Sequence, residues 1–242
     1  MHRTISRAFS WLGSHEPIVL LALAIVVASV WLFADLADEV IEGDTRHFDE
    51  RVLLMLRVPD DPATPVGPAW LAEVCHDITA LGGATVLVLM IAAVSGFLWL
   101  AQKRGAMWLV LASTTGGLLL SSLLKYYFAR PRPNVVPHLA NVDTASFPSG
   151  HSMMSAVAYL TLGALLARLV TRPLLKLYFL AMACLLTGLV GVSRVYLGVH
   201  YPTDVLAGWL AGLVWATLCW LVARWLQKRG QVESGGNGTH GG

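Results

Sequence analysis

Charged residues are scarce in this sequence: only 13% of its 242 residues are Asp, Glu, Lys or Arg. Soluble domains usually carry about 25% charged residues, so the composition argues against a soluble protein. The net charge is only +2 at pH 7, and the basic residues lie beside apolar runs instead of forming a separate arm. We therefore expect no nucleic-acid partner, and a membrane bilayer instead.

Cysteine is also rare. The three cysteines, Cys75, Cys184 and Cys219, form no CxxC pair and have no metal-like spacing with histidine. The sequence therefore predicts neither a disulfide framework nor a zinc site, and we expect all three cysteines to be structural.

Long apolar runs are abundant, since 56% of the residues are hydrophobic. Several runs approach the roughly 20 residues that cross a hydrocarbon core. They are residues 17–36, 81–101, 107–124, 152–170, 174–192 and 205–226. These runs predict an all-α bundle of six transmembrane helices, forming a single domain over 1–229 with a disordered tail at 230–242.

The start of the first run has two interpretations. Arg3 and Arg7 followed by an apolar stretch resemble a signal peptide, but the stretch is longer than a usual h-region and lacks an A-x-A cleavage site. We expect an uncleaved first span.

Basic residues predict the orientation of the bundle. Both terminal regions and two short connections are basic and fall on one side of a six-span arrangement. These are Arg3 with Arg7, residues 102–105, residues 168–176, and Arg224 with Lys228 and Arg229. The positive-inside rule makes that side cytoplasmic, so both termini face inward. We expect a bacterial inner membrane, with segments 37–80, 125–151 and 193–204 on the periplasmic or extracellular side.

The first outward segment, 38–80, contains a predicted amphipathic helix. Phe48, Val52, Met55 and Leu56 recur at helical spacing between charged residues that include Asp49. Such a helix either lies on the membrane interface or packs over the bundle. The proline-rich stretch 59–68 should be a turn or loop.

Four outward cations run against this topological bias, which suggests a task other than setting orientation: Lys125, Arg130, Arg132 and Arg194. Three of them, Lys125, Arg132 and Arg194, fit a phosphate-binding role, because guanidinium forks and an ammonium match the oxygens of a phosphate. Arg130 could meet a second phosphate of a diphosphate, or lipid headgroups.

The string Ser149-Gly150-His151 directly precedes the fourth apolar run. Its backbone N–H groups should lie at a helix N-terminus, which favours an anion, and Gly150 allows close approach of the backbone. Ser149 can equally be an ordinary helix N-cap.

His200 and Asp204 stand four positions apart at the start of the sixth run, on one helical face if the helix has begun there. A carboxylate on one ring nitrogen fixes the tautomer and leaves the other nitrogen free to attack phosphorus. His151 then remains as the acid that protonates the leaving oxygen and later activates water. This chemistry needs no metal and no cofactor.

Together these strings resemble the three-part signature of the PAP2 superfamily, the type 2 phosphatidic acid phosphatases, which also includes vanadium haloperoxidases. The three parts are Lys125-x6-Arg132-Pro133, Pro148-Ser149-Gly150-His151 and Ser193-Arg194-x5-His200-x3-Asp204, intact and in order. The resemblance extends over about 81–226. It implies that Lys125, Arg132, Ser149, Gly150 and Arg194 bind phosphate, that His200 forms a phosphohistidine supported by Asp204, and that His151 is the acid.

We therefore expect a metal-independent phosphatase that acts on a lipid phosphate or diphosphate at the outer membrane face. One alternative is a transport-related bundle, but the spans carry fewer mid-membrane charges than a transporter would need. The other is a catalytically silent scaffold of the same fold, which should lack a nucleophile or a cation, whereas every signature residue is present. Haloperoxidase activity does not suit a compact membrane bundle. The sequence does not indicate an oligomeric state, and His47, His76 and His138 have no motif partner.

Overall fold

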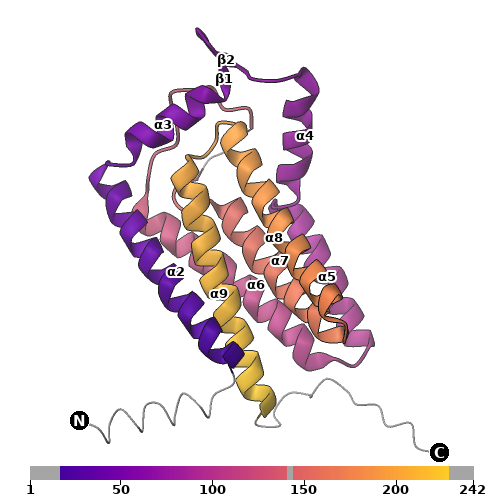
Figure 1. Cartoon of the computed structure of the whole chain (residues 1–242). Coiled ribbons are helices and arrows are strands. Elements are labelled where there is room, and N and C mark those ends of the chain that lie inside the picture. Colours follow the sequence, from indigo (N-terminus) through magenta and orange to yellow (C-terminus); the bar gives the residue numbers. More distant parts are fainter. Residues whose placement is uncertain (1–16, 141–143, 229–242) are drawn as a thin grey trace, which may run out of the picture.

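The computed structural model describes residues 17–140 and 144–228. The predicted tail 230–242 and the basic residues Arg3, Arg7 and Arg229 lie outside these ranges. Within them, helices dominate and one short hairpin is present (Figure 1). The elements are α2 (Pro17–Glu42), α3 (Arg46–Met55), β1 (Arg57–Val58), β2 (Asp61–Pro65), α4 (Ala69–Ala80), α5 (Ala84–Leu100), α6 (Arg104–Phe128), α7 (Gly150–Leu169), α8 (Pro173–Tyr196) and α9 (Pro202–Lys228).

The predicted membrane bundle is confirmed. Five single helices, α2, α6, α7, α8 and α9, are long and apolar enough to cross a bilayer. The sixth predicted span corresponds to α5, which follows α4 after a bend of 44° and gives a sixth crossing if the pair counts as one span. Each helix contains most or all of one predicted apolar run.

The helices extend beyond the apolar runs at the ends that carry the motifs. Helix α6 continues to Phe128 and so includes Lys125, while α8 continues to Tyr196 and includes Arg194. Helical backbone hydrogen bonds continue past the last apolar residue of each run, so polar residues occupy these terminal turns. As a result, Lys125 and Arg194 are held on helical backbone, whereas Arg132 lies in the connection after α6 and His200 in the connection before α9.

The two ends of the bundle differ in structure. The connections α5–α6 and α7–α8 lie at one end, together with the start of α2 and the end of α9 (Figure 1). At the other end, α3, the β-hairpin and α4 form a cap beside the α8–α9 connection. This cap is the segment that the sequence placed on the outer side.

The cap is more ordered than the sequence predicted. The stretch 59–68, expected to be a turn or loop, contains strand β2, which pairs antiparallel with β1, and helix α4 follows it. Prolines at the ends and edge of so short a hairpin remove few ladder hydrogen bonds, which explains why it tolerates them.

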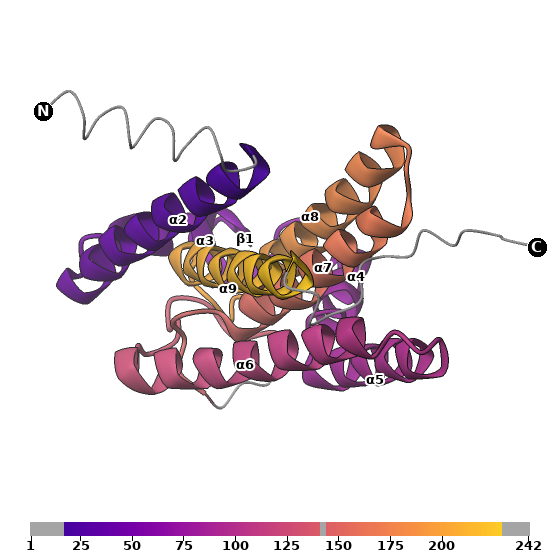
Figure 2. The same ribbon diagram turned by 90° about the horizontal axis from the view of Figure 1, so that it is seen from below.

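Helix α7 is central to the packing, contacting α6, α8 and α9, and α9 lies between α2 and α6 in the view along the bundle (Figure 2). Two glycines of α9 permit the close approach of α7. A Cβ on Gly208 would lie 2.7 Å from the carbonyl oxygen of Ser149, and one on Gly212 would lie 2.6 Å from Cβ of Ala156. This close approach places the start of α9 against the start of α7, where the signature strings meet.

Gly208→Ala should therefore lower both stability and activity. The added methyl would push α9 away from Ser149, and such overpacking typically costs about 1–3 kcal/mol. Gly188→Ala in α8 is the matched control, because nothing lies within 4 Å of a Cβ there. Thermal unfolding in detergent should show a lower Tm for Gly208→Ala alone, and equal Tm values would contradict this packing.

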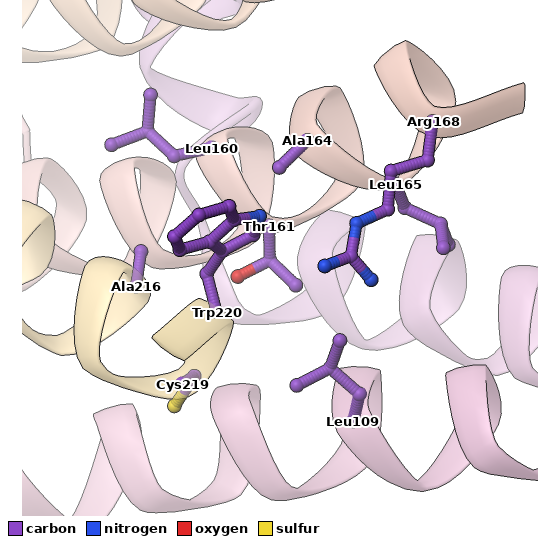
Figure 3. A pocket seen from close by; sticks show the side chains of 9 residues that line it. All are labelled: Leu109, Leu160, Thr161, Ala164, Leu165, Arg168, Ala216, Cys219 and Trp220. Atoms are coloured by element: carbon purple, nitrogen blue, oxygen red, sulfur yellow. The ribbon is translucent and has the colours of Figure 1, made fainter. Parts of the chain in front are cut away.

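At the opposite end of the bundle, α6, α7 and α9 enclose a small, mostly apolar cavity (Figure 3). The ring of Trp220 lies beside it, with the guanidinium carbons of Arg168 and Arg224 at 5.9 Å and 5.3 Å from the ring centroid. Cation–π attraction thus holds two basic residues at this end. None of the predicted site residues is among those that line the cavity.

Candidate active site

Four helix ends contribute most of the predicted site residues at the capped end of the bundle. Lys125 is in the last turn of α6 and Arg194 in the last turn of α8, whereas Gly150 and Asp204 are in the first turns of α7 and α9. The backbone N–H of Ser149 donates to the carbonyl oxygen of Asp204 at 2.9 Å. This bond joins the second and third strings of the signature directly.

His200 and Asp204 form a buried pair, with side chains only 2% and 0% exposed. The distance from His200 Nδ1 to Asp204 Oδ2 is 3.4 Å. Helix α9 begins at Pro202, so His200 precedes the helix and reaches Asp204 across its first turn. Asp204 Oδ2 also accepts from Ser146 Oγ and from the backbone N–H of Tyr201. These donors keep the carboxylate ionised and oriented toward the imidazole.

The other ring nitrogen of His200 faces the cationic residues. Arg132 Nη1 lies 3.2 Å from His200 Nε2 and also donates to the carbonyl oxygen of Val199 at 2.6 Å. Because a guanidinium only donates, Nε2 is the acceptor in this contact, and the ring proton sits on Nδ1 toward Asp204. Nε2 therefore presents a lone pair to the site.

Lys125 and Arg132 share a partner in the loop before α7. Arg132 Nε donates to the carbonyl oxygen of Thr144 at 2.7 Å, and its Nη2 donates to Thr144 Oγ1 at 3.2 Å. Lys125 Nζ contacts the same hydroxyl and the carbonyl oxygen of Ala145. Thr144 thus holds the two cations side by side.

Arg194 approaches from α8 and is 3% exposed. Its Nη1 donates to Thr79 Oγ1 of α4 at 3.1 Å, while Nε is buried without a hydrogen-bond partner among the described residues. A buried guanidinium with an unused donor is costly unless an acceptor arrives. The arrangement suits an anion that receives this hydrogen bond.

The string Ser149-Gly150-His151 lies at the start of α7 as the sequence predicted. Ser149 is the N-cap, and its hydroxyl accepts from the backbone N–H of Ser152 at 3.4 Å. A Cβ on Gly150 would lie 3.2 Å from Cε of Lys125, so this glycine packs against the lysine stem. His151 lies close enough to Lys125, Arg132, Arg194 and His200 for their charges to act on it. All eight predicted residues therefore gather at this end of the bundle.

Three further residues belong to the same hydrogen-bonded cluster, in positions that no sequence pattern predicts. Ser146 donates to Asp204, and Arg130 Nη1 donates to Asp204 Oδ1 at 2.6 Å. Arg130 also binds Asp49 at 2.9 Å, so its guanidinium is engaged by two carboxylates and is not directed at a second phosphate or a headgroup. Asp49, expected on the polar face of its helix, is fully buried.

The remaining histidines lie outside the cluster. His47, His76 and His138 are exposed, and His138 Nε2 is 2.6 Å from the carbonyl oxygen of Pro133. They are surface residues, as their lack of motif partners indicated.

Burial lowers the pKa of His200 to about 4, with Asp204 opposing this effect and Arg132 and Arg194 adding to it. The imidazole is therefore neutral at pH 7 in the folded protein, whereas in the unfolded chain it titrates near its ordinary value of 6.5. A neutral imidazole is the form that can act as a nucleophile.

This lowered pKa predicts an acid-sensitive fold. Between pH 6.5 and about 4 the unfolded chain binds more protons at His200 than the folded protein does. The contribution of His200 to the free energy of unfolding is therefore complete above pH 6.5 and is lost as the pH falls through about 4. Tm in detergent should decrease from pH 7 to pH 4, and less steeply in His200→Gln. Identical slopes in the two proteins would contradict the lowered pKa.

The chain is similar in sequence to known proteins. Residues 105–228 match the PAP2 superfamily model. Phosphatidylglycerophosphatase B of Bacillus subtilis (strain 168) is 37% identical over 148 residues, which are 60% of this chain and 71% of that protein. The undecaprenyl-diphosphatase of Sulfolobus acidocaldarius is 35% identical over 100 residues, 39% of this chain and 44% of that protein.

A solved structure is similar over a larger share of the fold. The crystal structure of a transmembrane PAP2 type phosphatidylglycerolphosphate phosphatase from Bacillus subtilis superimposes with a TM-score of 0.73 at 29% identity, covering 84% of this chain and 96% of that one. The match includes the membrane helices, so the chain is an integral membrane protein. From the family match, the relatives and the shared architecture, we conclude that this chain is a phosphatase of the PAP2 superfamily.

Proposed function

We propose that the chain hydrolyses the terminal phosphate of a membrane lipid through a phosphohistidine on His200. The observation that carries this proposal is the orientation of the His200 ring, with Nδ1 toward Asp204 and Nε2 toward the guanidinium of Arg132. Lys125, Arg132 and Arg194 supply three positive charges, whereas the carboxylate of Asp204 is already paired with Arg130. This concentration of positive charge matches a phosphate group.

In the first step, the incoming phosphate accepts hydrogen bonds from Lys125, Arg132 and Arg194, so the Arg132 bond to Nε2 is exchanged for one to a phosphate oxygen. Nε2 then attacks phosphorus, the bond from phosphorus to the lipid oxygen breaks, and His151 donates its proton to that oxygen. Asp204 stabilises the positive charge that develops on the imidazole. The lipid leaves as an alcohol, or as a monophosphate if the substrate was a diphosphate.

In the second step, a water molecule attacks the phosphohistidine. His151, now deprotonated, accepts a proton from the water, the bond from phosphorus to Nε2 breaks, and inorganic phosphate is released. Ser149 and Gly150 hold the start of α7 against the phosphate, where backbone N–H groups and the helix dipole favour the anion.

The position of the site and the relatives support an amphiphilic phosphate as the substrate class. The site lies at the end of the bundle that is capped by α3, the hairpin and α4, and an amphiphilic phosphate would enter there with its chains still in the lipid. The relatives are named for phosphatidylglycerophosphate and undecaprenyl diphosphate. Phosphatidylglycerophosphate is our first candidate, because the phosphatidylglycerophosphatase is matched over a larger share of its length than the undecaprenyl-diphosphatase.

We also propose that the site faces the outside of a bacterial inner membrane, with residues 1–229 acting as one domain. Arg168 and Arg224 lie at the end of the bundle opposite the site, where the positive-inside rule predicts the cytoplasm.

Phosphate release by the purified protein in detergent with a chelator present tests the proposed function. Phosphatidylglycerophosphate, phosphatidate, diacylglycerol diphosphate and undecaprenyl diphosphate are compared, with vanadate as a competitor for the phosphate site. We expect vanadate-inhibited release from at least one of them, with phosphatidylglycerophosphate fastest. Folded protein that neither releases phosphate from any lipid nor binds vanadate would overturn the proposal.

A further inference from the structure

Helix α3 of the cap places a carboxylate deep in the protein although much of the helix is exposed. Asp49 is 0% exposed, whereas Phe48 and Met55 on the same helix are 58% and 67% exposed. Oδ1 of Asp49 accepts from the backbone N–H of Thr203 at 3.1 Å, and Oδ2 accepts from Thr203 Oγ1 at 2.6 Å. Asp49 therefore binds the first turn of α9, one residue before Asp204.

Arg130 connects this carboxylate to the catalytic pair. Its Nη2 donates to Asp49 Oδ2 at 2.9 Å, and its Nη1 donates to Asp204 Oδ1 at 2.6 Å. The guanidinium also lies over the ring of Tyr201, 4.4 Å from the centroid, and its side chain is only 13% exposed. One planar group is thus fixed by two carboxylates and an aromatic face, which is the geometry that guanidinium favours.

The contacts form a continuous chain of alternating charge. It runs from Asp49 to Arg130, then to Asp204, and from Asp204 Oδ2 to Nδ1 of His200. Without Asp49, Arg130 would have Asp204 as its remaining carboxylate partner and could draw that carboxylate away from the imidazole. Asp49 balances this attraction from the opposite side.

We propose that Asp49 is a positioning residue for the reaction: by holding Arg130, it fixes Asp204 and thereby the orientation of the His200 ring. This inference depends on the proposed role of His200 as nucleophile. It gives helix α3, which contributes none of the predicted phosphate ligands, a direct influence on turnover. Asp49 touches neither the phosphate ligands nor the reacting nitrogen among its described contacts, so its effect should fall on turnover and not on binding.

Asp49→Asn keeps the shape of the side chain and removes its charge. We expect kcat for phosphatidylglycerophosphate to fall about 10- to 100-fold, as misplacement of a catalytic group does, with KM changed less than about twofold. Glu50→Gln is the matched control: it neutralises the next residue of the same helix, which pairs with the exposed Arg46 at 2.8 Å. Its kcat should equal that of the wild type.

A double-mutant cycle tests whether Asp49 acts through Arg130. Asp49→Asn combined with Arg130→Gln should lose no more activity than Arg130→Gln alone, because the connection is already broken. Fully additive losses, a wild-type kcat in folded Asp49→Asn, or a change confined to KM would each overturn the proposal. Vanadate binding and Tm report that each variant is folded.

Thr203→Val provides a second route if Asp49→Asn does not fold. It removes the hydroxyl that donates to Asp49 and accepts from Arg130 at 2.9 Å, without removing a charge. A several-fold lower kcat with unchanged KM is expected, and an unchanged kcat would overturn the proposal.

Wild-type protein and His200→Gln are assayed first. Inactive wild type, or active His200→Gln, would instead refute the proposed function, so the two failures are distinguishable.

Discussion

His200→Gln should abolish phosphate release, lowering kcat by about 10⁴-fold or more, as loss of a covalent nucleophile does in other two-step hydrolases. Glutamine retains a polar side chain of similar reach but cannot form a phosphoramidate that turns over. Lys125, Arg132 and Arg194 remain, so the variant should still bind vanadate or substrate. The measurement is phosphate release from phosphatidylglycerophosphate. A second measurement uses substrate labelled in its terminal phosphate and stops the reaction rapidly without acid, and labelled protein should appear with the wild type alone.

His138→Gln is the matched control for this experiment. His138 is also a histidine, but it is exposed and its Nε2 contacts the carbonyl oxygen of Pro133 and none of the eight predicted site residues among its described hydrogen bonds. Its activity should remain within about twofold of the wild type, because exposed substitutions away from a site are usually neutral. A His200→Gln protein that keeps more than about one hundredth of the activity would show that another group attacks phosphorus.

Much of this fold could be predicted because a bilayer imposes simple rules on a sequence. Apolar runs must be long enough to cross the hydrocarbon core, and a cation at the outward end of a run indicates a role other than setting orientation. Lys125 and Arg194 were recognised in this way, as cations on the side where the positive-inside rule disfavours them. His200 and Asp204 were recognisable because a pair four positions apart meets wherever a helix begins nearby.

Asp49 could not be predicted by the same reasoning. Periodicity assigns a carboxylate to the polar face of an amphipathic helix, because an ionised group is buried only when it is paired. Its partners Arg130 and Thr203 are 81 and 154 positions away, and no local pattern encodes such pairings. The β-hairpin was missed for a different reason: its strand Asp61–Pro65 is rich in proline and short, so propensity favours a loop.

His151 has the second large expected effect, and its size should depend on the leaving group. With a lipid phosphate, the departing oxygen needs a proton, so His151→Gln should lower kcat by about 10²–10⁴-fold, the usual contribution of general acid–base catalysis. With an aryl phosphate such as p-nitrophenyl phosphate, the departing phenolate is stable without a proton. The first step should then proceed at nearly the wild-type rate.

The second step provides the sharper test of His151. Hydrolysis of the phosphohistidine still requires a base to activate water, so His151→Gln should release one equivalent of nitrophenol per enzyme in a burst and then turn over slowly. His151 lies within range of the charges of His200 and of the three cations that we propose bind phosphate, and a group that serves both steps must lie there. An equal loss with both substrates and no burst would mean that His151 only binds phosphate, because removal of a ligand slows both steps regardless of the leaving group.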